Sequence, residues 1–190
     1  SSGSTRIDNV DVRRYDLKAL REKIGFIPQK ALLFTGSINE NIRYGKHNAV
    51  QTEVEHSAKV AQAYDFITEK PKQFEEMIEE GGGNVSGGQR QRLSIARAVV
   101  RKPDIYIFDE PTKGVDVGAK QDIFHLINQI AKQGHGVIYA SCENSELLSL
   151  TDRMYVMYNG TVMAELETAK TTEDEIMYYS VGGKDNKNGK

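Results

Sequence analysis

Hydrophobic and polar positions follow two different periods along this chain, which predict a mixture of strands and helices. Residues 6–12 alternate apolar and polar side chains around Asp8-Asn9, a pattern typical of two short strands joined by a turn. Three short apolar runs predict strands, and they lie at residues 24–28, 105–108 and 137–140. The run at 105–108 suits a parallel sheet that is buried on both faces, and the run at 137–140 is predicted to be buried as well.

Helices are predicted where apolar residues recur every three or four positions after a capping residue. Ser37 and Glu40 form a capping box, and Asp16 and Thr172 are further N-cap residues. The predicted helices run from Asp16 to Lys23, from Ser37 to Arg43, from Thr52 to Ala63, from Tyr64 to Ile67, from Asp116 or Val117 towards Gly134, and from Thr172 to Tyr179. Residues 154–165 predict a β-hairpin with an Asn159-Gly160 turn.

One stretch, residues 85–110, combines a glycine-rich turn, a basic amphipathic helix and an apolar strand. Ser86 is a natural N-cap, and Gly87 and Gly88 let backbone N–H groups approach a ligand closely. Because the positive end of the following helix dipole points at the same place, the turn is predicted to bind an anion.

Two adjacent carboxylates, Asp109 and Glu110, follow the apolar strand of this stretch. Ligands bind at the carboxyl ends of the strands in an open α/β sheet, so this pair suggests a metal-bound phosphate and a base that activates water. The alternative is a helix cap followed by a turn. The glycine turn one helix upstream favours the phosphate site.

The combination of VSGGQ with IYIFDE, ending at Glu110, resembles the signature motif and Walker B strand of an ATP-binding cassette (ABC) nucleotide-binding domain. This resemblance implies an α/β fold of the P-loop NTPase-like class, the ABC ATPase. Such a fold has a mostly parallel sheet and an inserted helical subdomain. It also implies ATP and Mg²⁺ as cofactors.

The resemblance implies a role for each motif residue. Glu110 would be the general base, and Asp109 would hold Mg²⁺. Gln29, in IGFIPQKALLF, resembles the glutamine of the Q-loop, which reaches Mg²⁺ and the attacking water. The signature residues Ser86, Gly87, Gly88 and Gln89 would contact the γ-phosphate of ATP held by a second domain, and Asp116 matches the D-loop aspartate.

Cys142 occupies the position where the family usually carries a switch histidine. None of the histidines of this sequence is placed to replace it. A thiol is a weak hydrogen-bond donor, so the resemblance implies poorer sensing of the γ-phosphate.

The two halves of the sequence resemble different branches of the family. LLFTGSINENIRYG resembles the exporters, in which this subdomain docks on the membrane domain, and exposed Phe34 and Tyr44 are contact candidates or members of a small core. The sequence after about Asp109 resembles the second ATPase domain of bacterial sugar importers. A recombined, fused or mis-assembled gene would explain the switch, and so would a divergent family member. The direction of transport and the substrate therefore stay open.

The sequence contains no GxxxxGK[ST] pattern, so the P-loop strand and helix of the family are missing from it. We therefore expect weak or no binding of ATP by the isolated chain. We also expect an uncovered part of the sheet, with poor stability or association as the result. The VSGGQ turn could still complete the ATP site of a partner.

Composition narrows the classes of function. The net charge of −2 gives no electrostatic reason to expect nucleic acid as a partner. A single cysteine excludes an internal disulfide framework and fits a reducing compartment. No apolar run reaches the length of a membrane-spanning helix, so a membrane part would lie elsewhere.

These observations favour the ATPase domain of an ABC transporter, which couples ATP hydrolysis to solute transport at the cytoplasmic face of the cell membrane. The expected partners are a second nucleotide-binding domain, in a homo- or heterodimer, and a membrane-spanning transporter domain. The alternative is a non-catalytic, degenerate or chimeric cassette that at most completes a partner's ATP site. A DNA-associated ABC ATPase is disfavoured because no coiled-coil heptads or zinc ligands interrupt the helical insert.

The expected organisation has four parts. Residues 1–36 belong to the core ATPase subdomain up to the Q-loop, and residues 37–88 form the helical subdomain that ends in the signature motif. Residues 89–181 complete the core subdomain, and residues 182–190 form a polar tail that composition predicts to be disordered.

Overall fold

The computed structural model describes residues 3–183 and divides the chain into two compact units between Ile138 and Tyr139. The elements up to the boundary are β1 (Arg6–Ile7), β2 (Val10–Asp11), η1 (Val12–Arg14), α1 (Leu17–Lys23), β3 (Ile24–Ile27), β4 (Gly36–Ser37), α2 (Ile38–Arg43), α3 (Gln51–Val60), α4 (Tyr64–Thr68), η2 (Gln73–Glu75), β5 (Met77–Ile78), η3 (Glu80–Gly82), α5 (Gly87–Val99), β6 (Ile105–Asp109) and α6 (Val117–Lys132). Strand β7 (Gly136–Ala140) crosses the boundary, and α7 (Asn144–Leu150), β8 (Arg153–Tyr158), β9 (Thr161–Glu167), η4 (Thr168–Lys170) and α8 (Glu173–Ser180) follow it.

Capping residues set the helix starts as the sequence predicts. Asp16 accepts hydrogen bonds from the N–H groups of Lys18 and Ala19, and Ser37 and Glu40 form the complete capping box. The helix predicted from Thr52 to Ala63 ends earlier, at Val60. Gln62 adopts a left-handed φ of 52°, which breaks the helical ladder there.

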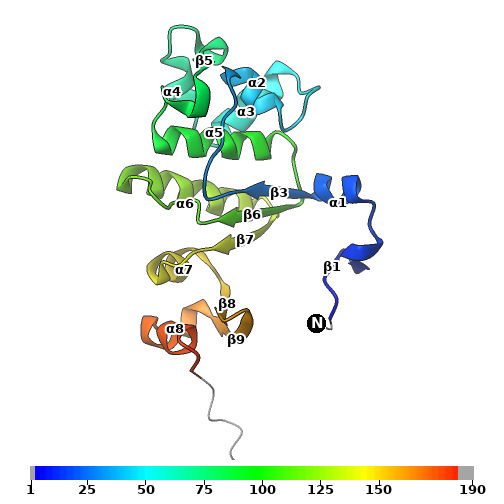
Figure 1. Ribbon diagram of the computed structural model, residues 1–190, viewed down its shortest axis with the longest axis vertical. Helices are drawn as coiled ribbons and strands as arrows, with labels where there is room; N and C mark the ends of the chain where they lie inside the picture. The colour runs from blue at the N-terminus through cyan, green and yellow to red at the C-terminus, as the bar shows by residue number, and fades with distance from the viewer. Residues whose placement is uncertain (1–2, 184–190) are drawn as a thin grey trace, which may run out of the picture. The chain divides into compact units, whose positions relative to one another are not determined.

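A three-stranded sheet with the order β3-β6-β7 lies at the centre of the first unit (Figure 1). Strands β3 and β6 are parallel, with Ile27 paired to Phe108. Helix α5 packs on this sheet, and its other side contacts α2 and α3 (Figure 1). The core between these layers contains fully buried Phe108, Ile27 and Leu93. Helix α5 is therefore the element that joins the sheet to the helical part of the unit.

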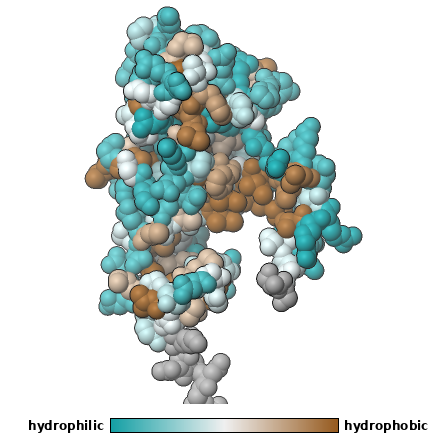
Figure 2. Space-filling view, viewed as in Figure 1, coloured by the Kyte–Doolittle hydropathy of each residue, from teal (hydrophilic) through white to brown (hydrophobic). Residues whose placement is uncertain are grey.

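The prediction that the strand at 105–108 is buried on both faces is wrong for the part of the chain that the structure describes. Gly25, Ile27, Tyr106 and Phe108 face the core, but the alternate positions of the same strands are only partly covered. Phe26 on that second face is 56% exposed. Figure 2 shows a hydrophobic area in the region of β3 and β6.

Strand β7 extends this second face. A side chain at Gly136 would contact Ile105, so Gly136 and Ile138 lie on the same face as Ile105. Ile138 is 55% exposed, so the predicted burial of residues 137–140 is also wrong. The apolar composition of these strands predicts that both faces are buried, but the described residues cover the second face only in part.

The second unit has a small core of its own. Strands β8 and β9 pair in the predicted hairpin, and Asn159 and Gly160 both have positive φ, as a type I′ turn requires. Met154 and Val156 of the hairpin pack on Ile176 and Tyr179 of α8. This unit is therefore a hairpin that buries one face under a helix.

The proposed division into residues 1–36, 37–88 and 89–181 stays a prediction. Most of the predicted tail, residues 184–190, lies outside the described residues. Within the described range, no helix combines the length and apolarity that crossing a membrane requires.

Candidate functional site

The N-terminus of α5 is closed by a reciprocal pair of side-chain hydrogen bonds. Ser86 Oγ accepts from the N–H of Gln89 at 3.2 Å, and Gln89 Oε1 accepts from the N–H of Ser86 at 3.0 Å. The cap leaves the N–H groups of Gly87 and Gly88 without a partner among the described residues. These two donors and the helix dipole make the turn suited to an anion such as a phosphate.

The two glycines of this turn lie against the turn that precedes α6. A Cβ atom at Gly88 would be 2.9 Å from Ala119 Cβ and 3.7 Å from Asp116 Oδ2. A Cβ atom at Gly87 would be 3.6 Å from the carbonyl oxygen of Gly114, an ordinary contact. The signature turn and the residues of the predicted D-loop are therefore neighbours within the first unit.

Asp116 is the N-cap of α6, and its Oδ1 accepts from the N–H of Ala119 at 2.9 Å. The prediction that the helix opens at Asp116 or Val117 is confirmed. Since Asp116 is exposed and lies next to Gly88, the N-termini of α5 and α6 present their donors on one side of the first unit.

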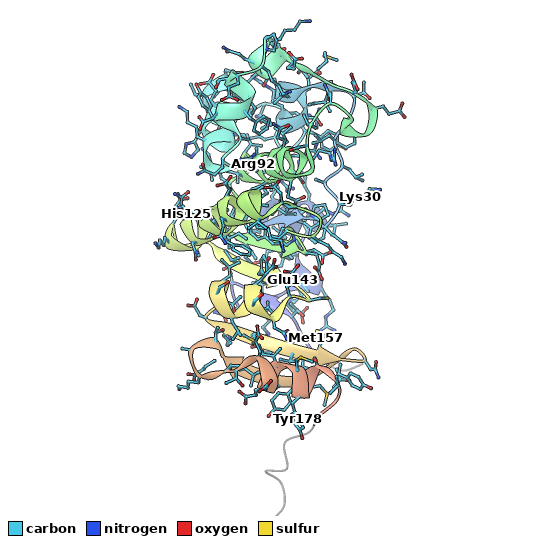
Figure 3. The ribbon with its side chains drawn as sticks, turned by 90° about the vertical axis from the view of Figure 1, so that its left-hand side faces the viewer. Lys30, Arg92, His125, Glu143, Met157 and Tyr178 are labelled. Atoms are coloured by element: carbon cyan, nitrogen blue, oxygen red, sulfur yellow. The ribbon has the colours of Figure 1, made fainter. Side chains whose placement is uncertain are left out.

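Parallel pairing of β3 and β6 brings Gln29 and the two carboxylates to one edge of the sheet. Ile27 of β3 pairs with Phe108 of β6. Gln29 follows Ile27 by two residues, and Asp109 and Glu110 follow Phe108 by one and two residues. Glu110 adopts a φ of 46°, which turns the chain sharply at the end of β6. Gln29 is exposed and Asp109 and Glu110 are partly exposed, so all three are accessible to a ligand. Figure 3 labels Lys30, the neighbour of Gln29.

Two aromatic side chains of β6, Tyr106 and Phe108, face the core. Tyr106 of β6 is buried, and burial raises the pKa of its phenol to about 12. The ring lies edge-on to His135 with centroids 5.3 Å apart and close to the ring of Phe108. Tyr106 therefore stays neutral and supports the strand as an apolar side chain.

The donor set at the edge fits a magnesium ion that is held partly by a nucleotide. Asp109 offers a carboxylate and Gln29 a neutral amide oxygen, both suited to a hard cation. No group of three His, Cys, Asp or Glu side chains able to hold a metal occurs among residues 3–183. Mg²⁺ commonly binds through one or two protein oxygens plus phosphates and waters, so the small number of protein oxygens at this edge is compatible with Mg²⁺.

Cys142 belongs to the second unit and follows β7. It is exposed. The same unit contains a buried carboxylate, Glu146, which is not among the predicted site residues. Glu146 Oε2 accepts from the hydroxyl of Tyr139 at 2.7 Å and from Ser141 Oγ at 2.9 Å. Glu146 is the one charged residue of α7, and the sequence of this helix gives no indication that it is buried.

Two arginines of α5, Arg90 and Arg92, are hydrogen-bonded within the fold. Arg90 Nη1 donates to the carbonyl oxygens of Gly82 and Val85 at 3.1 and 2.8 Å. Arg92 (Figure 3) donates to the carbonyl oxygen of Gln62 and pairs with Asp122 of α6, both at 3.2 Å. These arginines support the signature helix.

Phe34 and Tyr44 are exposed, as predicted, and their rings lie 4.5 Å apart. The guanidinium of Arg97 lies over both, 5.0 Å from the Phe34 centroid and 5.8 Å from that of Tyr44. The candidate contact surface is therefore an aromatic pair held by a cation from α5.

A parallel sheet with a phosphate-suited helix turn and paired carboxylates at its strand ends defines a P-loop NTPase-like α/β protein. A solved structure described as a bacterial Atm1-family ABC exporter with ATP bound matches 95% of this chain and 32% of its own, with a TM-score of 0.83 and 29% identity.

Sequence comparisons agree with this class. The family model described as ABC transporter matches residues 1–113. ABC transporter B family member 3 of Dictyostelium discoideum is 34% identical over 92% of this chain. Multidrug resistance protein homolog 65 of Drosophila melanogaster is 36% identical over 94% of it. The chain belongs to the ABC transporter family and corresponds to its nucleotide-binding domain.

The chain spans only a small part of these relatives, 12% of the Dictyostelium protein and 14% of the Drosophila protein. Both alignments run past residue 113 into the half whose wording resembles sugar importers. The importer resemblance of that half stays a prediction.

Proposed function

We propose that this chain is the ATPase domain of an ABC transporter of the exporter type, and that it serves ATP hydrolysis coupled to movement of a solute. The observation that carries the proposal is the register of β3 and β6, because it brings Gln29, Asp109 and Glu110 to one edge of the sheet. The similarity to exporters supports the branch.

Each residue at this edge has a role in the proposal. Glu110 accepts a proton from the attacking water, which a carboxylate at the end of a strand can do when it is accessible. Asp109 and Gln29 would hold Mg²⁺, and Gln29 would orient the water. The bound metal would neutralise charge on the phosphate oxygens. The solvent access of the three side chains supports these roles.

The signature turn serves a different nucleotide. The N–H groups of Gly87 and Gly88, with the hydroxyl of Ser86 and the amide of Gln89, would contact the γ-phosphate of ATP bound by a second nucleotide-binding domain. Such a dimer, docked on a membrane-spanning domain at the cytoplasmic face, places Phe34 and Tyr44 among the candidate contacts. Asp116 lies beside the same turn and belongs to the same interface.

A non-catalytic cassette is the second candidate, and one feature of the sequence favours it. Cys142 stands at the position where the family usually carries the switch histidine. In this alternative the chain contributes only its VSGGQ turn to a partner's ATP site.

The two candidates differ in whether Glu110 takes part in hydrolysis. The P-loop strand and helix of an exporter relative can be joined before Ser1, and Mg-ATP hydrolysis by the purified product measured. We expect activity, and Glu110→Gln should lower kcat by about a hundredfold or more, the usual contribution of a general base.

Glu69→Gln is the matched control, because Glu69 is an exposed glutamate at the end of α4. It should leave the rate unchanged. A Glu110→Gln protein as active as the control would refute the hydrolytic role. The Ser86→Arg variant then tests the second candidate, since it should abolish activity in a mixed dimer whose partner alone supplies the P-loop.

A further inference from the structure

The segment after β3 is held at both ends by side chains of α5. Gln91, which is 3% exposed, has its Nε2 3.4 Å from the carbonyl oxygen of Pro28. Arg97 Nη1 donates to the carbonyl oxygen of Leu32 at 2.8 Å. These two contacts bracket Gln29, which itself is exposed.

Arg97 joins this segment to α2 as well. Its Nε donates to the carbonyl oxygen of Asn41 at 2.9 Å, and its Nη2 donates to Asn41 Oδ1 at 3.0 Å. Asn41 is buried, accepts from the N–H of Phe34 at 2.9 Å and donates to the Phe34 carbonyl at 2.8 Å. One guanidinium therefore connects α5, α2 and the segment that ends at Phe34.

The environment explains why this position requires an arginine. Burial lowers the pKa of Arg97, so the charged form needs partners in place of water. The structure supplies the carbonyl oxygens of Asn41 and Leu32 as acceptors, and the guanidinium carbon lies over the rings of Phe34 and Tyr44. A lysine ammonium lacks the planar fork that satisfies these oxygens together.

We infer that Arg97 is a positioning residue that fixes the segment from Gln29 to Phe34 to α5, so that the helix and this segment move as one body. Gln91 assists at the other end of the segment. The significance of Gln29 for Mg²⁺ and water rests on the proposed function, but the mechanical link rests on the contacts alone.

The link has a consequence for the signature turn. Arg97 lies 11 residues after Ser86 on the same helix, which is about 16 Å at 1.5 Å per residue. A displacement of α5 caused at its N-terminal turn would therefore carry Gln29 and the aromatic pair with it. One helix would connect the anion-binding turn, the metal-binding edge and the exposed aromatic surface.

The test uses the 190-residue chain and two readouts that involve no nucleotide. Exchange of the Phe34 amide is measured by NMR, and a nitroxide at Lys30→Cys, in a Cys142→Ser background, reports the mobility of the segment by EPR. Arg97→Met keeps the apolar stem but removes every donor. We expect exchange of the Phe34 amide to accelerate about tenfold, as loss of one charge-assisted hydrogen bond predicts. The label should also gain a faster component.

Arg101→Met is the matched control, because Arg101 follows α5 and donates to the carbonyl oxygen of Arg21 in α1, away from this segment. It should change neither readout. Arg97→Lys keeps the buried charge and should give intermediate exchange and mobility, and it serves as the test if Arg97→Met does not fold.

Unchanged label mobility and Phe34 exchange in the Arg97 variants would overturn the inference. So would a loss of protection that extends equally to α5 amides such as that of Ala96, since a general loosening is not positioning. Failure of the ATPase assay leaves both readouts interpretable, so the two proposals fail separately.

Discussion

Gly88→Ala tests whether the turn before α5 and the N-terminus of α6 are packed as tightly as the structure shows. The added methyl group would lie 2.9 Å from Ala119 Cβ, whereas carbon atoms in contact prefer about 3.5 to 4.0 Å. The neighbouring atom is the Cβ of another helix, which cannot rotate away. The two helices must therefore separate by roughly half an ångström or more.

The expected destabilisation follows from the cost of overpacking. Inserting one methyl group into a well-packed contact costs about 1–3 kcal/mol. Alanine is also a better helix former than glycine, by about 1 kcal/mol, which acts in the opposite direction. Gly87→Ala has the same gain in propensity but meets only an ordinary contact at 3.6 Å. The difference in the free energy of unfolding between the two variants therefore measures the cost of the close contact with Ala119 alone.

Urea denaturation followed by far-UV circular dichroism measures this difference. We expect the free energy of unfolding of Gly88→Ala to be about 1–3 kcal/mol below that of Gly87→Ala. Adding Ala119→Gly removes the opposing methyl group, so Gly88→Ala should be harmless in that background. Equal stability of the two alanine variants, or no effect of Ala119→Gly on their difference, would refute the reasoning.

Two further predictions concern charge and the open sheet face. Lys46 hydrogen-bonds Glu53, and this contact lowers the pKa of the Glu53 carboxyl group to about 2, compared with about 4.3 in the unfolded chain. The charged carboxylate therefore stabilises the fold above about pH 4.3, and this stabilisation is lost as the pH falls towards 2. Glu53→Gln should therefore flatten the decline of Tm between about pH 4 and pH 2, and an unchanged pH profile would contradict this assignment. The double variant Phe26→Thr, Ile138→Thr should self-associate less than the wild-type chain in sedimentation velocity. Tyr44→Thr, on another surface, serves as the control. A wild-type chain that is monomeric at every concentration tested would count against the prediction.

Local chemistry explains which elements could be predicted. The caps at Asp16, Ser37 and Asp116 are satisfied by atoms within three residues, so the sequence is sufficient to place these helix starts. The Asn159-Gly160 turn is local in the same sense. Helix α3 was predicted too long because Gln62 adopts a left-handed conformation that its residue type does not require.

The roles of the arginines could not be predicted, because they depend on atoms far away in the chain. Arg97 bonds carbonyl oxygens 56 and 65 residues earlier, and Arg92 bonds one 30 residues earlier. A helical period places these side chains on a face of α5 but does not say what lies opposite. Glu146 differs in distance, since its partners Tyr139 and Ser141 are only seven and five residues earlier, but its burial still depends on how α7 folds back on β7 and the loop after it.

The sequence alone determined the family motifs, because VSGGQ, IYIFDE and the glutamine after a proline are read from residue type and spacing. It also determined that these motifs end strands or begin helices. Only the tertiary structure decided that β3 and β6 pair in the register that gathers Gln29, Asp109 and Glu110, and that Gly88 lies against Ala119. It also decided that one face of the sheet is open, because burial depends on what packs against a strand and not on the strand's own composition.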